Sequence, residues 1–355
     1  MGLTARRAFV ATLVAGGTVA LALALWKLKV ILALIFLGFI VAAAMRPGVE
    51  WMRGRGIPRG LGILAHYAVL AALVGGLLWA VVPRALDQVQ TAIGDLPETR
   101  SDLRQEADES TGVRQRVLRG VERRLERLPQ PEELLDEGAE VGLIAIEIAV
   151  GLLFVLAIGA YWIFERGRAE RLVCRLLPER HERTVCDTWE LIDLKLGAYV
   201  RGQGLLVVLV ATVLSAAFWA IGLPFWLLIA IFAGLVELVP VIGPLVAGAL
   251  AVGVGLTESV GVAIAAGLAV LVVRLLEDYV VIPRVLGDAV GLTPLTVLIA
   301  VAVSAVLFGE FAVLLAIPLA AIGATLVDVV LLDKDPAQED VPAVLFPAKD
   351  AETAG

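Results

Sequence analysis

The chain has 355 residues, of which 59% are hydrophobic and only 18% are charged, and its mean hydropathy is +0.90. Soluble domains contain about 45–50% apolar and about 25% charged residues, so this composition excludes a soluble domain and indicates a membrane protein. The net charge of −7 provides no basic surface for nucleic acid, and we expect no nucleic-acid partner.

Continuous apolar runs rich in Leu, Val and Ala recur along the chain. A helix needs about 20 mostly apolar residues to cross a bilayer, whereas a barrel strand alternates apolar and polar residues. Because the runs are continuous, we predict an all-α, polytopic membrane protein whose helices satisfy their own backbone groups. The first five spans are predicted at residues 8–26, 30–45, 60–82, 140–164 and 204–222.

The first two runs are separated by three residues only. This spacing suits a membrane hairpin better than a cleaved leader. Arginines precede the first run, at Arg6 and Arg7, and gather again in the segment 46–59. Because basic residues in short loops stay in the cytoplasm, we expect a cytoplasmic N-terminus and N-terminal membrane helices over residues 1–83.

Polar regions separate the membrane segments. Residues 84–138 include the amphipathic stretch VLRGVERRLERL and are predicted to form a soluble, extracytoplasmic helical insert before a fourth membrane helix at 139–164. Residues 165–203 are predicted to form a cytoplasmic helical loop with a break at Pro178. Residues 333–355 form a polar tail that we expect to be disordered.

Two cysteines, Cys174 and Cys186, lie in the second polar region. No second cysteine pair or neighbouring histidine supplies the spacing of a metal site. Because cytoplasmic thiols stay reduced, we expect two free thiols, and we predict no metal and no cofactor.

The C-terminal membrane core, residues 204–332, has a different pattern. Beyond residue 222, its runs lie at 225–239, 245–256, 258–282, 294–308 and 311–332. The first two are separated by ELVPVIGP and the last two by FGE. Counting each interrupted pair once gives eight spans for the chain, and counting the halves gives up to ten. We expect about eight transmembrane helices, with broken or re-entrant segments in this part of the chain.

The stretch ELVPVIGP interrupts an apolar run, residues 223–256, in which Glu237 is the only charged residue. A charge at membrane depth is costly, so Glu237 needs a partner from another segment, from water or from a proton. Pro240 and Pro244 remove backbone donors, and Gly243 allows unusual torsion angles. In a bilayer, such a break is tolerated only where it lines a cavity or is buried in protein.

Arg274, Glu277 and Asp278 are spaced i, i+3 and i+4, so we expect them to share one helical face and to pair there. Local charge pairing near a helix end and a role in a transport pathway are both open interpretations. The sequence alone does not separate them.

A second interruption contains Gly309, Glu310 and Pro318. Secondary transporters use paired helix breaks near the membrane midplane to bind substrate or cation. The alternative is a short turn between two tilted helices, because the flanking runs are short enough to be re-entrant.

Motifs of several enzyme classes are missing from the sequence. It has no G-x-x-x-x-G-K-[ST] loop for ATP, no H-E-x-x-H pair for zinc and no G-x-S-x-G elbow. Gradient-driven or passive permeation therefore fits better than catalysis, and we do not expect an enzyme.

Four motifs, in this order and spacing, resemble the autoinducer-2 exporter-like permeases, a broad bacterial family of polytopic membrane proteins. They are YVRGQGLL at 199–206, GLVELVPVIGP at 234–244, VIPRVLGDAVGLTPL at 281–295 and LFGEFAVLLAIPLAA at 307–321. The resemblance covers residues 8–332. It implies an eight-span protein of the bacterial inner membrane that moves small molecules or ions without ATP.

The resemblance also implies partners. Some members are linked to export of autoinducer-2 and others to sodium–proton exchange, and assembly into homo-oligomers, with a pentamer as one form, is suggested for the family. The implied partners are a small-molecule or ion substrate, the lipid bilayer and further copies of the chain.

Candidate residues come from the motifs and from the charges at membrane depth. Those carried over from the family motifs are Gly202, Gln203 and Pro283 as structural positions and Pro240, Gly243, Pro244, Arg284, Gly287, Pro294, Gly309 and Pro318 as transport-site candidates. The charges add Glu237, Arg274, Asp278 and Glu310. Glu310 departs from the family, whose members often have an apolar or small residue there.

The leading hypothesis is a secondary transporter or exporter of a small polar molecule, such as autoinducer-2, coupled to protons or sodium. Glu237 and the face from Arg274 to Asp278 would carry the coupling ion, because burial favours the neutral form of a carboxylate. The alternatives are an oligomeric channel or pore, a sodium–proton antiporter, and a membrane scaffold that works through 84–138 or 165–203.

Overall fold

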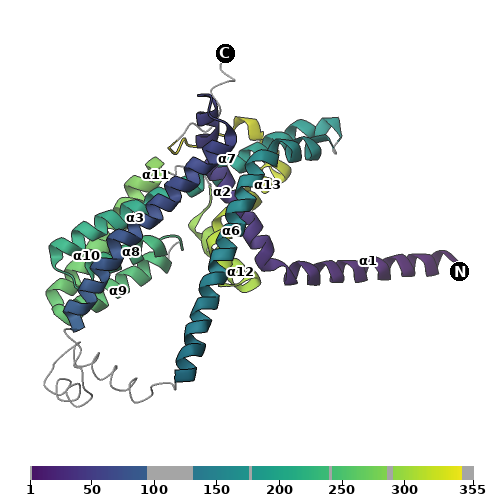
Figure 1. Ribbon diagram of the computed structural model, residues 1–355. Helices are drawn as coiled ribbons and strands as arrows, with labels where there is room; N and C mark the ends of the chain where they lie inside the picture. Colours follow the sequence, from purple (N-terminus) through teal and green to yellow (C-terminus); the bar gives the residue numbers. More distant parts are fainter. Residues whose placement is uncertain (1, 94–130, 176–177, 240–241, 286–290, 346–355) are drawn as a thin grey trace.

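The computed structural model describes residues 2–93, 131–175, 178–239, 242–285 and 291–345, and in these ranges every regular element is a helix (Figure 1). The N-terminal elements are α1 (Gly2–Lys27), α2 (Lys29–Arg53), α3 (Arg59–Ile93), α6 (Pro131–Arg175) and α7 (Glu179–Ile221). They are followed by α8 (Trp226–Val236), α9 (Ile242–Glu258), α10 (Val260–Leu276), the π-helix η1 (Glu277–Val281), α11 (Ile282–Val285), α12 (Pro294–Phe308), the 3-10 helix η2 (Glu310–Leu315), α13 (Ala316–Leu331) and the 3-10 turn η3 (Pro336–Gln338).

Seven segments of the described chain are long and apolar enough to cross a membrane by length and composition. Five of them lie in α1, α2, α3, α6 and α7. The sixth runs from α10 into α11, and the seventh runs from η2 through α13. The helices α8, α9 and α12 are apolar but shorter. The prediction of a polytopic α-helical membrane protein with interrupted C-terminal segments is confirmed.

The prediction that the first two apolar runs form a membrane hairpin is wrong. Only Leu28 separates α1 from α2, and the hydrogen bonds from Leu28 N to Ala24 O and from Leu32 N to Leu28 O carry the helical pattern through the junction. The chain bends at Leu28, but α1 does not fold back along α2 and points away from the other helices (Figure 1).

Two of the polar regions continue the membrane helices. The predicted loop 165–203 consists of the end of α6 and the start of α7, and Pro178 lies at the N-cap of α7, where a break was expected. The insert 84–138 likewise begins as the end of α3 and ends as the start of α6. Its amphipathic stretch falls at 117–128, outside the described residues.

The prediction of two free thiols is also wrong. Cys174 and Cys186 are joined by a disulfide, with their Cα atoms 6.0 Å apart. The reason is local: the two residues lie near the end of α6 and the start of α7, which are separated by only three residues in sequence.

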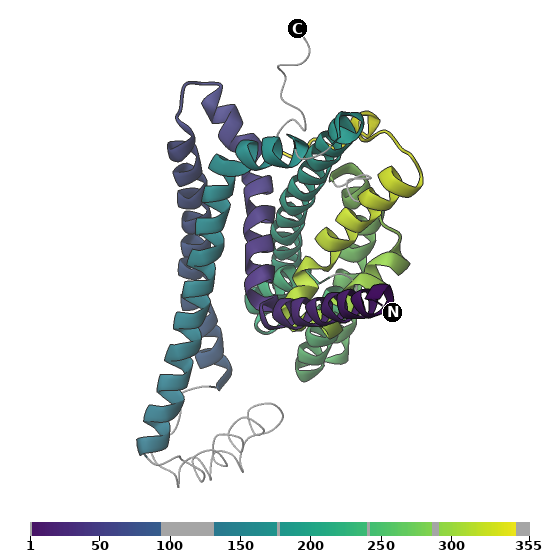
Figure 2. The same ribbon diagram turned by 90° about the vertical axis from the view of Figure 1, so that its right-hand side faces the viewer.

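In the N-terminal part of the fold, α2 lies between α6 and α7 and packs on both (Figure 2). Gly38 of α2 allows this approach, because a Cβ atom there would lie 2.6 Å from Cγ2 of Ile158 in α6. An added methyl group would therefore force the two helices apart.

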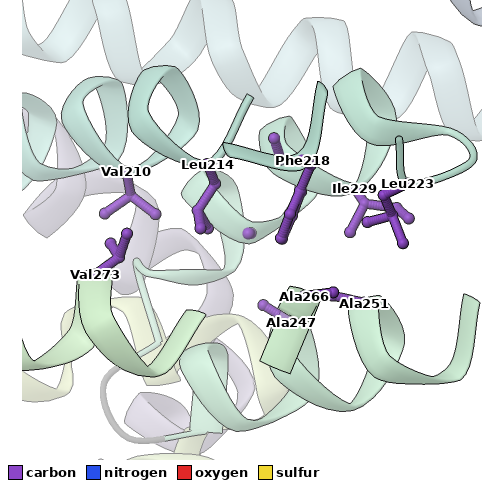
Figure 3. Close-up of a cluster of buried hydrophobic side chains, with 11 residues drawn as sticks. Val210, Leu214, Phe218, Leu223, Ile229, Ala247, Ala251, Ala266 and Val273 are labelled. Carbon is purple, nitrogen blue, oxygen red and sulfur yellow. The ribbon is translucent and has the colours of Figure 1, made fainter. Parts of the chain in front are cut away.

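The largest hydrophobic core joins α7 to the three helices that follow it. Leu214 and Phe218 of α7 point toward Ala247 and Ala251 of α9 and Ala266 of α10 (Figure 3). Small residues let helix backbones approach closely, and van der Waals packing of this kind drives helix association in lipid. The alanines therefore hold α9 and α10 against the large side chains of α7.

The interruption at ELVPVIGP is a turn between two packed helices. α8 and α9 contact each other, α8 also packs on α7, and α9 packs on α10. Two halves of one straight span would lie end to end, so these contacts favour a helical hairpin. Pro240 lies outside the described residues.

The second interruption has the same form. Gly309 ends α12 with a φ of 97°, a backbone conformation that favours glycine, and η2 then leads into α13. α12 and α13 pack against each other. This geometry supports a turn between two helices, which was the alternative to a broken span.

Part of the tail that was expected to be disordered makes defined contacts, and residues 346–355 lie outside the described residues. Nε of the buried Arg201 donates to the backbone oxygen of Val344 at 2.8 Å, and Nζ of Lys195 lies 2.6 Å from Oε1 of Glu339. Arg201 also donates to the backbone oxygen of Ala44 in α2 at 3.2 Å. Two buried cations of α7 thus take their partners from the tail, and this explains why the tail is held.

Gly255 and Gly253 of α9 provide a matched test of the α9–α10 contact. A Cβ atom at Gly255 would lie 2.6 Å from the Cα atom of Ala263, whereas a Cβ atom at Gly253 would meet nothing within 4 Å. We expect Gly255→Ala to destabilise the protein by about 1–3 kcal/mol through overpacking. We expect Gly253→Ala to be neutral or stabilising by up to about 1 kcal/mol through helix propensity. Unfolding in detergent measures both, and equal effects would contradict the packing.

Candidate transport site

Glu237 lies at the C-cap of α8, where the chain turns toward α9. Its side chain is only 9% exposed, and its Oε1 accepts a hydrogen bond from Nη1 of Arg274 at 3.1 Å. Arg274 belongs to α10, so the partner comes from a different segment, as expected for a carboxylate without charged neighbours in sequence.

The same guanidinium contacts two further carboxylates. Its Nη1 lies 3.8 Å from Oε2 of Glu277, and its Nη2 lies 3.0 Å from Oδ1 of Asp278. The predicted pairing of these residues on one helical face is confirmed. We refer to Glu237, Arg274, Glu277 and Asp278 as the acidic cluster, because it contains three carboxylates and one guanidinium.

Glu277 is the least satisfied member of the acidic cluster. Its side chain is 3% exposed, and its Oε1 is buried without a hydrogen-bond partner among the described residues. A buried carboxylate oxygen without a partner is costly, so it favours a proton or a cation at that position. The sequence reasoning placed Glu277 on the charged face but did not select it as a site residue; its position between two candidates was the available signal.

Exposure rises across the acidic cluster. The side chain of Arg274 is 29% exposed and that of Asp278 is 40% exposed, whereas Glu237 and Glu277 are buried. The cluster therefore reaches from the protein interior to its surface.

The backbone at the acidic cluster is irregular in two places. The π-helix η1 begins at Glu277, and π-helical turns inside α-helices are frequent at functional sites. The other irregular place is the α8–α9 turn, which frees the backbone oxygen of Glu237. Nε2 of the buried Gln203 donates to this oxygen at 3.0 Å. Gln203 thereby fixes the turn that carries Glu237.

Gly243 has a steric role in the same turn. A Cβ atom at this position would overlap the backbone oxygen of Val236, one residue before Glu237. Only glycine lets the start of α9 lie this close to the end of α8. Pro244 follows in the first turn of α9, where its missing N–H removes no intrahelical hydrogen bond.

The remaining candidates lie outside the acidic cluster. Gly202 precedes Gln203 in α7, Pro283 and Arg284 are exposed on α11, Pro294 begins α12, and Pro318 is buried in α13. Glu310 begins η2, and its side chain is not described. Gly287 lies outside the described residues. In the described part of the chain, η2 packs on α2, α12 and α13, whereas the acidic cluster lies on α8, α10 and η1.

Sequence reasoning missed two buried cations of α7. Arg201 and Lys195 hold the C-terminal tail, and Nζ of Lys195 also donates to Oγ1 of the buried Thr325 in α13 at 3.2 Å. Arg201 belongs to the motif YVRGQGLL, so its place in that motif was a usable signal. Val344 lies 143 residues away from Arg201 in sequence, so this contact left no local pattern.

Replacing Gln203 tests whether the α8–α9 turn depends on its hydrogen bond. In Gln203→Leu the buried backbone oxygen of Glu237 loses its donor, so we expect a loss of about 1–3 kcal/mol in the free energy of unfolding. The control is Thr212→Val on the same helix, which removes an exposed local hydrogen bond and should change stability by about 0.5 kcal/mol or less. Equal losses in the two variants would show that the Gln203 bond does not hold the turn.

Replacing Arg274 tests the charge balance of the acidic cluster. Arg274→Gln leaves three carboxylates without a cation, and we expect it to lower the free energy of unfolding by about 3 kcal/mol. Arg284→Gln, at an exposed arginine of α11, is the control. Adding Glu237→Gln to Arg274→Gln should recover part of the loss; a further, additive loss would argue against charge as the cause.

The chain is similar to a described family of transporters and to relatives that are named after transport. A family model described as AI-2E family transporter matches residues 17–332. Three relatives bear the name "Putative transport protein": YrrI of Bacillus subtilis is 23% identical over 83% of this chain and 85% of its own length, MT0215 of Mycobacterium tuberculosis is 27% identical over 88% and 86%, and YueF of Bacillus subtilis is 25% identical over 75% of each chain. The resemblance that the four motifs carry is confirmed. The chain therefore belongs to the AI-2E transporter family of multi-pass membrane proteins.

Proposed function

We propose that this protein is a secondary transporter that moves a small polar molecule or ion without ATP, and that the acidic cluster binds the proton or sodium ion to which transport is coupled. Family membership supports membrane transport in general. The assignment of the coupling ion rests on the charges that the fold gathers at the α8–α9 turn.

The observation that carries the proposal is the excess of negative charge. One guanidinium faces three carboxylates, two of which are buried. Uncompensated charge is expensive in a medium of low dielectric constant, so the fold favours binding of further positive charge. A carboxylate oxygen without a partner, such as Oε1 of Glu277, is a suitable acceptor for a proton and a suitable ligand for a hard cation.

Sodium–proton exchange is a second candidate that the same observation favours. If protons and sodium compete for the carboxylates of the acidic cluster, binding of one releases the other. The ions are then the cargo, and no organic substrate is needed.

We also propose a bacterial inner-membrane location with a cytoplasmic N-terminus and assembly into homo-oligomers, including pentamers. The arginine-rich segment 46–59 supports the orientation. α1 exposes most of its large apolar side chains, such as Phe9, Leu13 and Leu23, which suits contact with lipid or with another copy of the chain.

Transport in proteoliposomes tests the proposal. Liposomes that contain a pH-sensitive dye are made acidic inside, and sodium is added outside. If protons and sodium compete for the acidic cluster, wild-type protein releases protons. Loss of a charged ligand weakens ion binding by about tenfold or more, so Glu237→Gln and Glu277→Gln should slow this release accordingly at low sodium concentration. The control is Glu258→Gln, which replaces an exposed carboxylate at the end of α9.

Wild-type rates and unchanged coupling in both cluster variants would remove the acidic cluster from the mechanism. Unitary currents in planar bilayers would identify a pore instead of an exchanger. Thermal unfolding of each variant in detergent confirms that a loss of transport does not come from unfolding.

A further inference from the structure

A second charged site, of the opposite sign, lies between the ends of α2, α3, α6 and α7. It is a cavity of about 970 Å³, which falls in the range of about 300–1,000 Å³ that small-molecule sites occupy. Seven arginines line it, and it shares no residue with the acidic cluster. We call it the arginine cavity, and its arginines include Arg46, Arg55, Arg59, Arg166 and Arg171.

The arginine cavity has more positive than negative charge. Its seven arginines face three carboxylates, Glu50, Glu165 and Asp193. Each of these carboxylates is already in an ion pair: Oδ2 of Asp193, for example, lies 2.8 Å from Nη1 of Arg46 and 3.2 Å from Nε of Arg166. A concave surface with one sign of charge attracts ions of the other sign. The expected ligand is an anion.

Arg166 shows where such an anion would bind. Its side chain is 11% exposed, and Nη1 donates to Oε2 of Glu170 at 3.2 Å. Its Nη2 is buried and has no hydrogen-bond partner in the part of the chain that the structure describes. Guanidinium groups match the geometry of phosphate oxygens and bind them through parallel hydrogen bonds. A phosphate in the cavity would supply the acceptor that Nη2 lacks.

The surroundings of the arginine cavity are those of a membrane interface. The guanidinium of Arg55 lies 3.5 Å from the centre of the Trp51 ring, and both residues line the cavity. Tryptophan is enriched where a bilayer meets water. Phe164 of α6 also lines the cavity. Its side chain and those of Leu61 and Leu64 in α3 are each more than half exposed. These apolar side chains provide a surface for acyl chains.

We propose that the arginine cavity binds a phosphate-bearing anion, and that its bearer is an acidic phospholipid whose headgroup enters the cavity while its chains lie on the exposed apolar side chains of α3 and α6. Basic pockets between transmembrane helices bind such headgroups. This site is independent of the proposed transport function, because it involves other residues and other helices.

Binding to purified protein in detergent tests the site with three probes: phosphatidylglycerol, phosphatidylcholine of the same chain length, and inorganic pyrophosphate. We expect phosphatidylglycerol, but not phosphatidylcholine, to raise the unfolding temperature in a concentration-dependent way. The double variant Arg55→Gln/Arg171→Gln removes two exposed cavity charges and should weaken the apparent affinity for phosphatidylglycerol by about tenfold or more. Arg183→Gln, at an exposed arginine of α7 outside the cavity, should bind like wild type.

The probes also separate the two sources of phosphate. Stabilisation by phosphatidylglycerol that the double variant loses supports a lipid headgroup. Stabilisation by pyrophosphate alone, also lost in the double variant, supports the anion site and assigns it to a soluble phosphate compound. No stabilisation by either anion, or equal stabilisation of wild type and the double variant, would overturn the proposal. The unfolding temperature without ligand shows whether each variant is folded.

Discussion

Charge balance around Arg274 is the constraint that the C-terminal part of this protein has to meet. Its guanidinium is the cation that pairs with Glu237, Glu277 and Asp278, and it joins the α8–α9 turn to α10. An ionisable group in an apolar environment must be paired or neutralised. One cation cannot neutralise three carboxylates, and the proposed function assigns the remaining negative charge to a bound proton or sodium ion. Coupling of transport to an ion requires a binding position of this kind.

The residues around the acidic cluster support the α8–α9 turn. Gln203 satisfies the backbone oxygen of Glu237, and Gly243 lets the start of α9 lie against the end of α8. The alanines of α9 and α10 then pack closely on the large side chains of α7. The packing between α7, α9 and α10 is made by alanines against Leu214 and Phe218, so the acidic cluster is held by closely packed helices. A rigid frame would keep the charges in place during the proposed ion exchange.

Local features were predictable from the sequence, and distant contacts were not. The spacing of Arg274 and Asp278 follows from helix periodicity, so their pairing could be derived. The need of Glu237 for a partner followed from the cost of a buried charge, but nothing in the sequence identified a residue 37 positions away. The docking of the tail on Arg201 involves a still longer separation. The hairpin of α1 and α2 was mispredicted because apolar runs show where helices lie and not how they join.

The central claim is that buried carboxylates of the acidic cluster exchange a proton for another cation. Infrared difference spectroscopy on the purified protein measures this directly, because a protonated carboxyl group has a carbonyl band that a carboxylate lacks. If this exchange occurs, sodium removes such a band from wild-type protein, and the change is absent from Glu277→Gln and retained in Glu258→Gln. An identical difference spectrum for wild type and Glu277→Gln would contradict the account.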